Sequence, residues 1–365
     1  MIPRGCATRQ DWIAGFVQLA ILIVALCLAT MPLPSELIEK SYSQGFYPVV
    51  RRVVTGWSSQ INLVLFDWLL VGGVGGTVGW WALSLVRAVR LKRLRMFMRP
   101  AWRTLVIMAV VYIVFLTTWG LNYRRQSLGT RLGYLENRVT VAQLEKLATV
   151  AVGRVNGLHD ATEGESWPQL SDLPDRLGAA FVRIQRSLGV LEPTDGLMPR
   201  RSILTPYFRR AGIDGMVDPF FLQVLVNDTV LPFERPFVAA HEWAHVAGYA
   251  HEAEANFVAW LSCLEGDTAM QYSGWFYLVG RLLRVLPGSS QAVFASRLGP
   301  GPRADYASIR ERFNRTVPIV QRNASRINDR YLRANQVASG VASYGEVIQL
   351  VVGTDVGRQR WLSLE

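Results

Sequence analysis

Residues 241–257 read HEWAHVAGYAHEAEANF, and this stretch decides the fold that we expect. Its first five residues form the pattern HExxH. Residues four apart lie on one face of a helix, so His241 and His245 can offer imidazole nitrogens to one metal ion. Glu242 is placed to take a proton from a water molecule that the metal activates. Imidazole ligands suit Zn²⁺, and a catalytic zinc site needs a third protein ligand and an open position for that water.

Three residues that follow the HExxH pattern are candidates for the third ligand. We expect Gly248 to end the first helix in a left-handed cap, and a second helix to run over residues 250–264. Glu252 lies on or beside the small-residue face of that second helix, from which its carboxylate can reach a metal held by the first helix. Glu252 is therefore the favoured ligand, and His251 and Glu254 are the alternatives.

Two classes of zinc peptidase share parts of this spacing. Glu252-x-x-x-Asn256 resembles the Glu-x-x-x-Asp of gluzincins, which implies that Glu252 binds zinc and that Asn256 supports a ligand histidine. An amide is neutral, so this support is expected to be weaker than that of an aspartate. His251 completes HExxHxxGxxH, which looks like the metzincin signature, and Met270 resembles the Met-turn of that class.

Further segments extend the resemblance beyond the HExxH pattern. They are EAEANF at 252–257, QYSG at 271–274, Pro236-Phe237, Gly215-Met216 and WGLNYR at 119–124. Together with HEWAH and Gly248 they resemble a bacterial membrane family, the domain of unknown function 3810, over roughly residues 100–350. The resemblance implies a membrane-anchored, zincin-like domain. In the family's pattern the two glutamates recur and the position of His251 varies, which favours Glu252 or Glu254.

Three long apolar stretches predict transmembrane helices over about residues 13–31, 61–86 and 105–121. Seven basic residues and no acidic one lie between the second and third stretches, at 87–103. The positive-inside rule therefore places this loop and the N-terminus in the cytoplasm. Everything after Tyr123 then lies outside the cytoplasm, and we expect a multi-pass protein of the bacterial cytoplasmic membrane.

The second stretch carries two further features. Asp67 lies near its start, where we expect the carboxylate to sit close to the lipid headgroups, although an acid inside a span is also a candidate functional group. Residues 72–79 hold five glycines with small-xxx-small spacing, which is typical of close helix packing in lipid. This predicts either a paired site within the chain or a contact in a homo-oligomer.

The remaining pattern predicts a mainly α-helical protein. Residues 1–123 are expected to form a membrane domain, and residues 124–365 a mostly helical, zincin-like α+β domain with a small sheet. Expected elements are helices over about 140–155, 174–188, 275–286 and 304–337, a strand over 220–227, a helix or strand over 344–352, and loops over 193–219. The predicted strand is in the right place to lie beside the HExxH helix and to hold an extended substrate.

Charge and cysteine content exclude other classes of protein. The formal net charge is +11, but seven of the cations lie in the loop at 87–103, where anionic lipid explains them. We therefore expect no nucleic-acid partner. Only Cys263 of the three cysteines lies beyond the membrane domain, so no disulfide is expected there, and it is predicted to be buried.

The sequence thus predicts a zinc metallopeptidase that cleaves peptide bonds in a peptide or protein outside the cytoplasm. His241, His245 and Glu252 would hold Zn²⁺, with Glu242 as the general base. Two rival hypotheses remain at this point. One is a non-catalytic membrane protein with a structural metal site, and the other is a transport or assembly component that works through Asp67 and the glycine-rich span.

Overall fold

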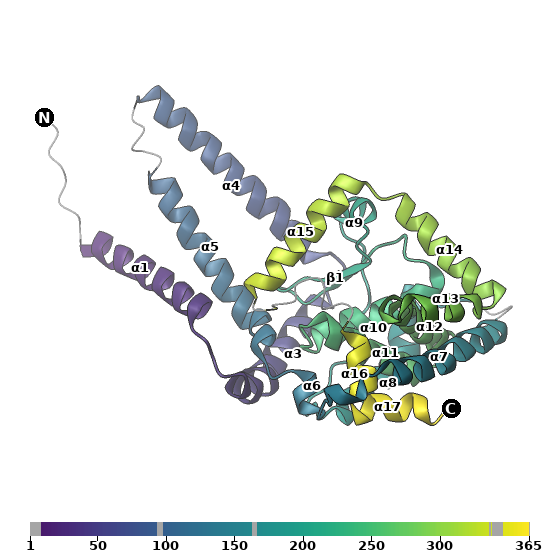
Figure 1. Ribbon diagram of the computed structural model, residues 1–365. Helices are drawn as coiled ribbons and strands as arrows, with labels where there is room; N and C mark the ends of the chain where they lie inside the picture. Colours follow the sequence, from purple (N-terminus) through teal and green to yellow (C-terminus); the bar gives the residue numbers. More distant parts are fainter. Residues whose placement is uncertain (1–8, 93–97, 163–165, 336, 338–345, 365) are drawn as a thin grey trace, which may run out of the picture.

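The computed structural model describes residues 9–92, 98–162, 166–335, 337 and 346–364, and it is mainly α-helical (Figure 1). A two-stranded sheet and three long apolar helices complete the architecture. This confirms the expected fold class: a mainly α-helical protein with three candidate membrane spans and a small sheet.

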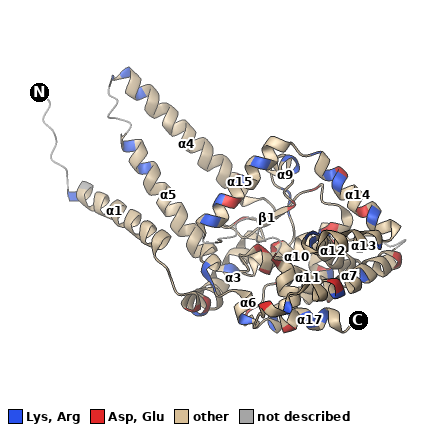
Figure 2. Cartoon of the chain, in the orientation of Figure 1, with Lys and Arg blue, Asp and Glu red and all other residues tan. Residues whose placement is uncertain are grey.

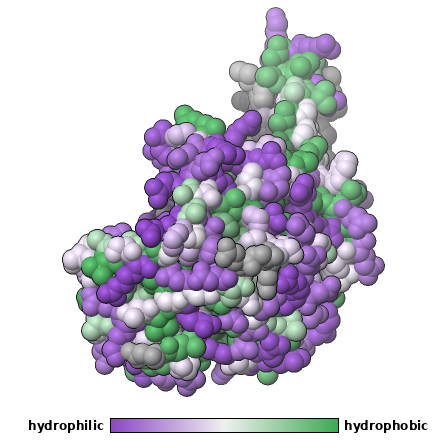
Figure 3. Space-filling view, turned by 90° about the vertical axis from the view of Figure 1, so that its right-hand side faces the viewer, coloured by the Kyte–Doolittle hydropathy of each residue, from purple (hydrophilic) through white to green (hydrophobic). Residues whose placement is uncertain are grey.

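Three helices are long and apolar enough to cross a membrane. They are α1 (Arg9–Thr30), α4 (Leu65–Arg90) and α5 (Met98–Thr118), and they project from a globular body (Figure 1). Each overlaps one predicted span. Lys and Arg residues, blue in Figure 2, lie at the ends of these helices that are far from the body. Green apolar surface covers much of the projecting part, whereas the body is mostly hydrophilic (Figure 3).

The chain between the first two spans is folded onto the body. It forms α2 (Ser35–Leu37), a π-helical segment (Ile38–Phe46) and α3 (Tyr47–Ser58). Tyr47 is fully buried there, and Ile38 and Tyr42 join the main hydrophobic core. This packing was not foreseen. The division of the chain at residue 123 stays a prediction, but residues 35–58 pack with the part that follows it.

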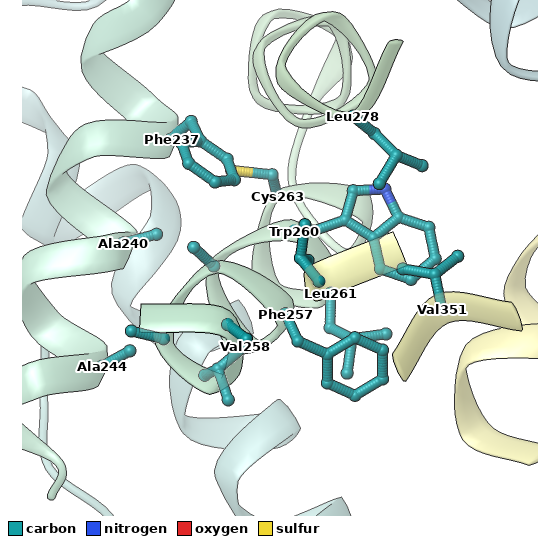
Figure 4. Packing of buried hydrophobic residues seen from close by; sticks show 14 of the residues in the cluster. Phe237, Ala240, Ala244, Phe257, Val258, Trp260, Leu261, Cys263, Leu278 and Val351 are labelled. Atoms are coloured by element: carbon teal, nitrogen blue, oxygen red, sulfur yellow. The ribbon is translucent and has the colours of Figure 1, made fainter. Parts of the chain in front are cut away.

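The core of the body is built around α11 (Glu252–Leu264), whose residues from Glu252 to Cys263 are all buried. Figure 4 shows Phe257, Trp260 and Leu261 of this helix among apolar side chains of its neighbours. The neighbouring helices are α8 (Leu173–Ser187), α10 (Arg235–Val246), α12 (Thr268–Val285) and α16 (Val347–Gly353), and α7 (Val141–Thr162) packs on α12. A helix buried on all sides needs small residues where other backbones approach, and the alanines of α11 provide them.

The sheet differs from the predicted strand at 220–227. Strand β1 (Gly215–Val217) pairs antiparallel with β2 (Val224–Val226), with Met216 opposite Leu225. Residues 218–223 form the connecting turn, because the Asp218 carboxylate accepts backbone N–H groups of Phe220, Phe221 and Gln223. Leu222 in this turn has a positive φ of 54°. The apolar run at 220–222 is therefore turn rather than strand, and β1 lies in a segment expected to be loop.

A proline divides the long helix predicted at 304–337. The structure has α14 (Pro300–Asn314) and α15 (Pro318–Ala334), and Pro318 opens the second. A residue before proline is driven out of the helical region, and Val317 indeed has extended backbone angles. The other short elements are α6 (Leu128–Arg131), α9 (Thr205–Ala211), α13 (Gly288–Ser296), α17 (Asp355–Leu362) and 3-10 turns at Gly120–Arg124, Glu136–Arg138, Leu170–Asp172 and Pro232–Glu234.

The free cysteines agree with the prediction. Cys263 is buried in α11 and Cys27 is exposed on α1, and neither forms a disulfide. Cys6 lies outside the described residues.

Candidate metal centre

Helix α10 presents the two histidines on one face, as the HExxH spacing predicts. Pro236 lies in its first turn, where a missing N–H costs nothing. The rings of His241 and His245 are 4.6 Å apart between centroids. Gly248 ends the helix with a φ of 92°, and its N–H donates to the carbonyl of His245 at 3.0 Å. The predicted left-handed cap is confirmed, and it turns the chain back so that α11 can begin close by.

Helix α11 brings Glu252 to the histidines. Its Oε2 lies 3.3 Å from Nε2 of His241 and 3.6 Å from Nε2 of His245, and the two Nε2 atoms are 3.1 Å apart. Ligands at about 2.0–2.1 Å from a tetrahedral zinc are about 3.3 Å from one another. The three atoms are therefore already spaced as three corners of a zinc tetrahedron, so these residues fit the metal.

Unpaired buried atoms at the same place support this fit. Nδ1 of His241, the ring nitrogen that does not face Glu252, has no hydrogen-bond partner. Oε2 of Glu242 is also buried without a partner, and Oε2 of Glu252 has only the two Nε2 atoms beside it. Buried polar atoms are normally paired, so such a cluster points to a missing polar ligand. His245 is different, because its Nδ1 lies 2.8 Å from the carbonyl of Tyr249. That carbonyl can only accept, so it fixes the proton on Nδ1 and leaves Nε2 free to bind.

The pKa values of His245, Glu252 and Glu242 depend on one another because the three side chains are buried close together. Burial alone would lower the pKa of His245, but the Glu252 carboxylate outweighs it and raises the pKa to about 9. Burial acts to raise the pKa of Glu252, yet the two histidines hold it well below its usual range. Burial raises the pKa of Glu242 to about 6. A cation that binds at Nε2 of His245 must therefore compete with a proton.

The alternative third ligands point elsewhere. Nε2 of His251 lies 3.1 Å from the carbonyl of Tyr123. Oε1 of Glu254 accepts the backbone N–H of Leu128 at 2.6 Å. Among the described residues, the group that can hold a metal consists of His241, His245 and Glu252, which we call the triad.

Two expectations from the peptidase classes are not met. Met270 lies in the first turn of α12, where its N–H is capped by Asp267, so it forms no Met-turn. Asn256 is buried, but its Nδ2 has no hydrogen-bond partner, and neither has Nδ1 of His241. The hydrogen bond expected from Asn256 to a ligand histidine is therefore not formed.

Strand β1 lies against the predicted general base. A Cβ added to Gly215 would come within 2.5 Å of Oε1 of Glu242. Only glycine permits this approach, which explains a residue that the resemblance had singled out. Of the described residues, only β2 pairs with β1. The strand that borders the site is thus β1 rather than the segment first expected.

Sequence reasoning missed how residues 245–248, which we call the ligand loop, are held in place. The indole N–H of Trp119 donates to the carbonyl of His245 at 2.9 Å, and the hydroxyl of Tyr47 donates to that of Val246 at 2.6 Å. Arg125 donates to the carbonyl of Gly248 at 2.9 Å. These donors come from segments next to the membrane spans. Trp119 directly follows α5, and it belongs to the WGLNYR segment that the family resemblance singled out without giving it a role.

Tyr277 of α12 was also missed. Its ring stacks on Phe237 at 3.7 Å between centroids, and its hydroxyl is buried without a hydrogen-bond partner. Burial raises its pKa to about 12; Arg281 opposes this rise and the charge of Glu252 adds to it. This phenol is therefore a neutral donor, and the Phe237 ring on which it stacks also stacks on His241, at 6.4 Å between centroids.

The sequence singled out two features of the second span, Asp67 and the glycines of 72–79, and the structure, over the residues that it describes, shows a contact for Asp67 alone. Asp67 is buried and accepts the hydroxyl of Ser202 and, at 2.9 Å, the N–H of Ile203, so it fastens α4 to the body. Within the described residues nothing lies within 4 Å of a Cβ placed at the glycines of 72–79. A contact of these glycines with another copy of the chain stays a prediction.

Comparison with known proteins gives one match. The sequence pattern of DUF3810, a protein family of unknown function, matches residues 42–352. The chain belongs to this family. The DUF3810 match begins inside the π-helical segment before α3 and ends in α16, so it includes the membrane-side segments as well as the triad. No curated protein and no solved structure matches the chain.

Proposed function

We propose that this DUF3810 protein is a membrane-anchored, zincin-like zinc metallopeptidase. The observation that carries the proposal is the spacing of the three ligand atoms of His241, His245 and Glu252, at 3.1–3.6 Å from one another, beside a buried Glu242. A structural zinc site has four protein ligands, whereas three protein ligands and a nearby carboxylate are typical of hydrolytic sites.

His241, His245 and Glu252 would hold Zn²⁺ in this scheme. When bound, the ion supplies a Lewis acid and lowers the pKa of water in its open position. Glu242 accepts the proton of the attacking water, and a pKa raised to about 6 suits a base that works near neutral pH. Tyr277 donates its hydroxyl proton in a hydrogen bond to the carbonyl oxygen of the substrate, where negative charge develops.

Strand β1 is the element that we assign to substrate binding. It borders Glu242 through Gly215, and its edge away from β2 offers backbone N–H and C=O groups. An extended peptide can pair with such an edge, and main-chain pairing accepts many side chains. The substrate is therefore a polypeptide segment in an extended conformation.

The side of the membrane follows from the charges. The basic residues of α4 and α5 lie at the ends of the spans far from the body (Figure 2). By the positive-inside rule those ends are cytoplasmic, so the metal centre is extracytoplasmic. The transport hypothesis has lost support, because Asp67 is engaged by Ser202 and Ile203 rather than facing the membrane interior.

The test is peptide hydrolysis by purified full-length protein and by Glu242→Gln, with zinc content measured on both. We expect the variant to keep its zinc and to lose about a hundredfold to ten-thousandfold in turnover, the usual contribution of a general base. Glu311→Gln, at an exposed position of α14, is the control and should leave turnover unchanged. Unchanged turnover in Glu242→Gln would show that Glu242 is not the base.

A further inference from the structure

Helix α3 has two faces of opposite character. Phe46, the residue just before α3, and Val49, Val53 and Trp57 of α3 follow one another at helical spacing and are each 50–65% exposed. The other face is buried against the body, with Tyr47 fully enclosed. Four large apolar side chains on one exposed helix face are unusual for a surface that meets water.

A second segment of the chain is fastened to α3. The backbone carbonyl of Glu192 accepts a hydrogen bond from Arg51 of α3, at 2.5 Å, and the Glu192 carboxylate pairs with Arg52. Leu191, the residue before Glu192, is 79% exposed. The segment that α3 binds therefore also carries a large exposed apolar side chain.

The position of α3 indicates what covers this face. Only six residues, 59–64, separate α3 from the span α4. The ring of Trp57 contacts Phe221, at 6.2 Å between centroids, and the adjacent Phe220 stacks on Phe66 in the first turn of α4. A chain of aromatic rings thus joins the apolar face to the membrane end of a span. Aromatic side chains at this depth are typical of the membrane interface.

We propose that α3 is an interfacial helix whose apolar face, formed by Phe46, Val49, Val53 and Trp57, lies in the lipid headgroup region. The occupant of the face is the bilayer that the three spans cross. An amphipathic helix in this position buries its apolar side chains at the boundary between headgroups and acyl chains.

This arrangement ties the metal centre to the membrane surface. The face of α3 opposite the lipid carries Tyr47, whose hydroxyl bonds the carbonyl of Val246 next to the ligand His245. One helix therefore touches lipid on one side and the end of α10 on the other. A helix with its side chains is about 10–12 Å across, so the ligand loop lies about that far from the lipid.

The experiment places a nitroxide on α3 of the full-length protein in vesicles of phosphatidylcholine and phosphatidylglycerol. The three cysteines are first replaced by Cys6→Ser, Cys27→Ser and Cys263→Ala. Single cysteines are then introduced as Val53→Cys and, on an exposed site of α14, as Ser308→Cys. Power saturation measures collision of each label with oxygen, which concentrates in lipid, and with a water-soluble nickel chelate.

The proposal predicts that the label at 53 collides more with oxygen than with the chelate, and that the label at 308 shows the reverse. A label at 53 as open to the chelate as the one at 308 would overturn it. Low collision with both reagents would also overturn it, because the face would then be covered by protein. Val49→Cys, on the same face, repeats the measurement at a second position.

Discussion

Replacing Glu39 tests how the segments next to the membrane spans hold the candidate metal centre. Its carboxylate receives two hydrogen bonds from Arg125, each 2.8 Å long, and the two side chains are 6% and 3% exposed. Arg125 in turn donates to the carbonyl of Gly248 in the ligand loop. Glu39→Gln keeps the shape of the side chain but leaves the guanidinium charge buried and uncompensated.

The expected cost follows from this burial. Breaking a buried ion pair by removing one partner destabilises a protein by about 3–5 kcal/mol. Each kcal/mol shifts Tm by about 2–4 °C in domains of roughly 150–250 residues, so Glu39→Gln should lower Tm by about 6–20 °C. The pair is also pH-sensitive: burial opposes ionisation of Glu39, but Arg125 outweighs it and lowers the pKa. Its stabilisation is thus present above the unfolded pKa, near about 4.3, and is lost as pH falls below it.

The assay is thermal unfolding of full-length protein in detergent, followed by tryptophan fluorescence. The matched control is Glu192→Gln, which removes a carboxylate from Arg52 in an exposed pair, with side chains 66% and 47% exposed. Exposed pairs contribute about 0–1 kcal/mol, so the control should lose at most about 4 °C. Equal shifts in the two variants would refute the claim that Glu39 and Arg125 anchor the ligand loop.

Three further predictions concern the metal centre. Gly215→Ala should displace Glu242, because the added Cβ would lie 2.5 Å from Oε1, and peptidase turnover should fall at least tenfold with zinc retained; full activity would contradict the role of β1. Tyr277→Phe should lower kcat by about tenfold to a thousandfold with zinc retained, and an unchanged kcat would remove Tyr277 from the mechanism. Zinc affinity, measured by competition with a chromophoric chelator, should rise about tenfold per pH unit up to about pH 9, since His245 holds a proton below that pKa. Glu252→Gln removes the charge that raises this pKa, so any remaining zinc binding should level off at a lower pH; an unchanged pH profile would show that Glu252 does not set it.

The parts of the site that sequence could predict are those with local causes. His241 and His245 share a helix face because of their spacing, and Gly248 ends that helix because glycine accepts a positive φ. The three spans follow from length and apolarity alone. The choice of Glu252 over His251 and Glu254 was only a preference, because it depends on where α11 begins relative to α10.

The parts that sequence could not predict depend on distant contacts. Nothing local in residues 35–58 indicates that Tyr47 reaches Val246, about two hundred positions later in the chain. The turn at 218–223 replaced a strand because the Asp218 carboxylate offered the backbone a competing set of hydrogen bonds. The break at Pro318, in contrast, had a local signal in the proline itself.

Zinc content is the most direct test of the central claim. Full-length protein purified without chelators should carry about one zinc per chain, by the three-ligand rule for hydrolytic sites. Glu252→Ala should lose it, whereas His251→Ala should keep it, because His251 points to the carbonyl of Tyr123 instead. Zinc retained in Glu252→Ala and lost in His251→Ala would contradict the ligand set. Absence of zinc from the wild-type protein, even after dialysis against the metal, would contradict the metal centre itself.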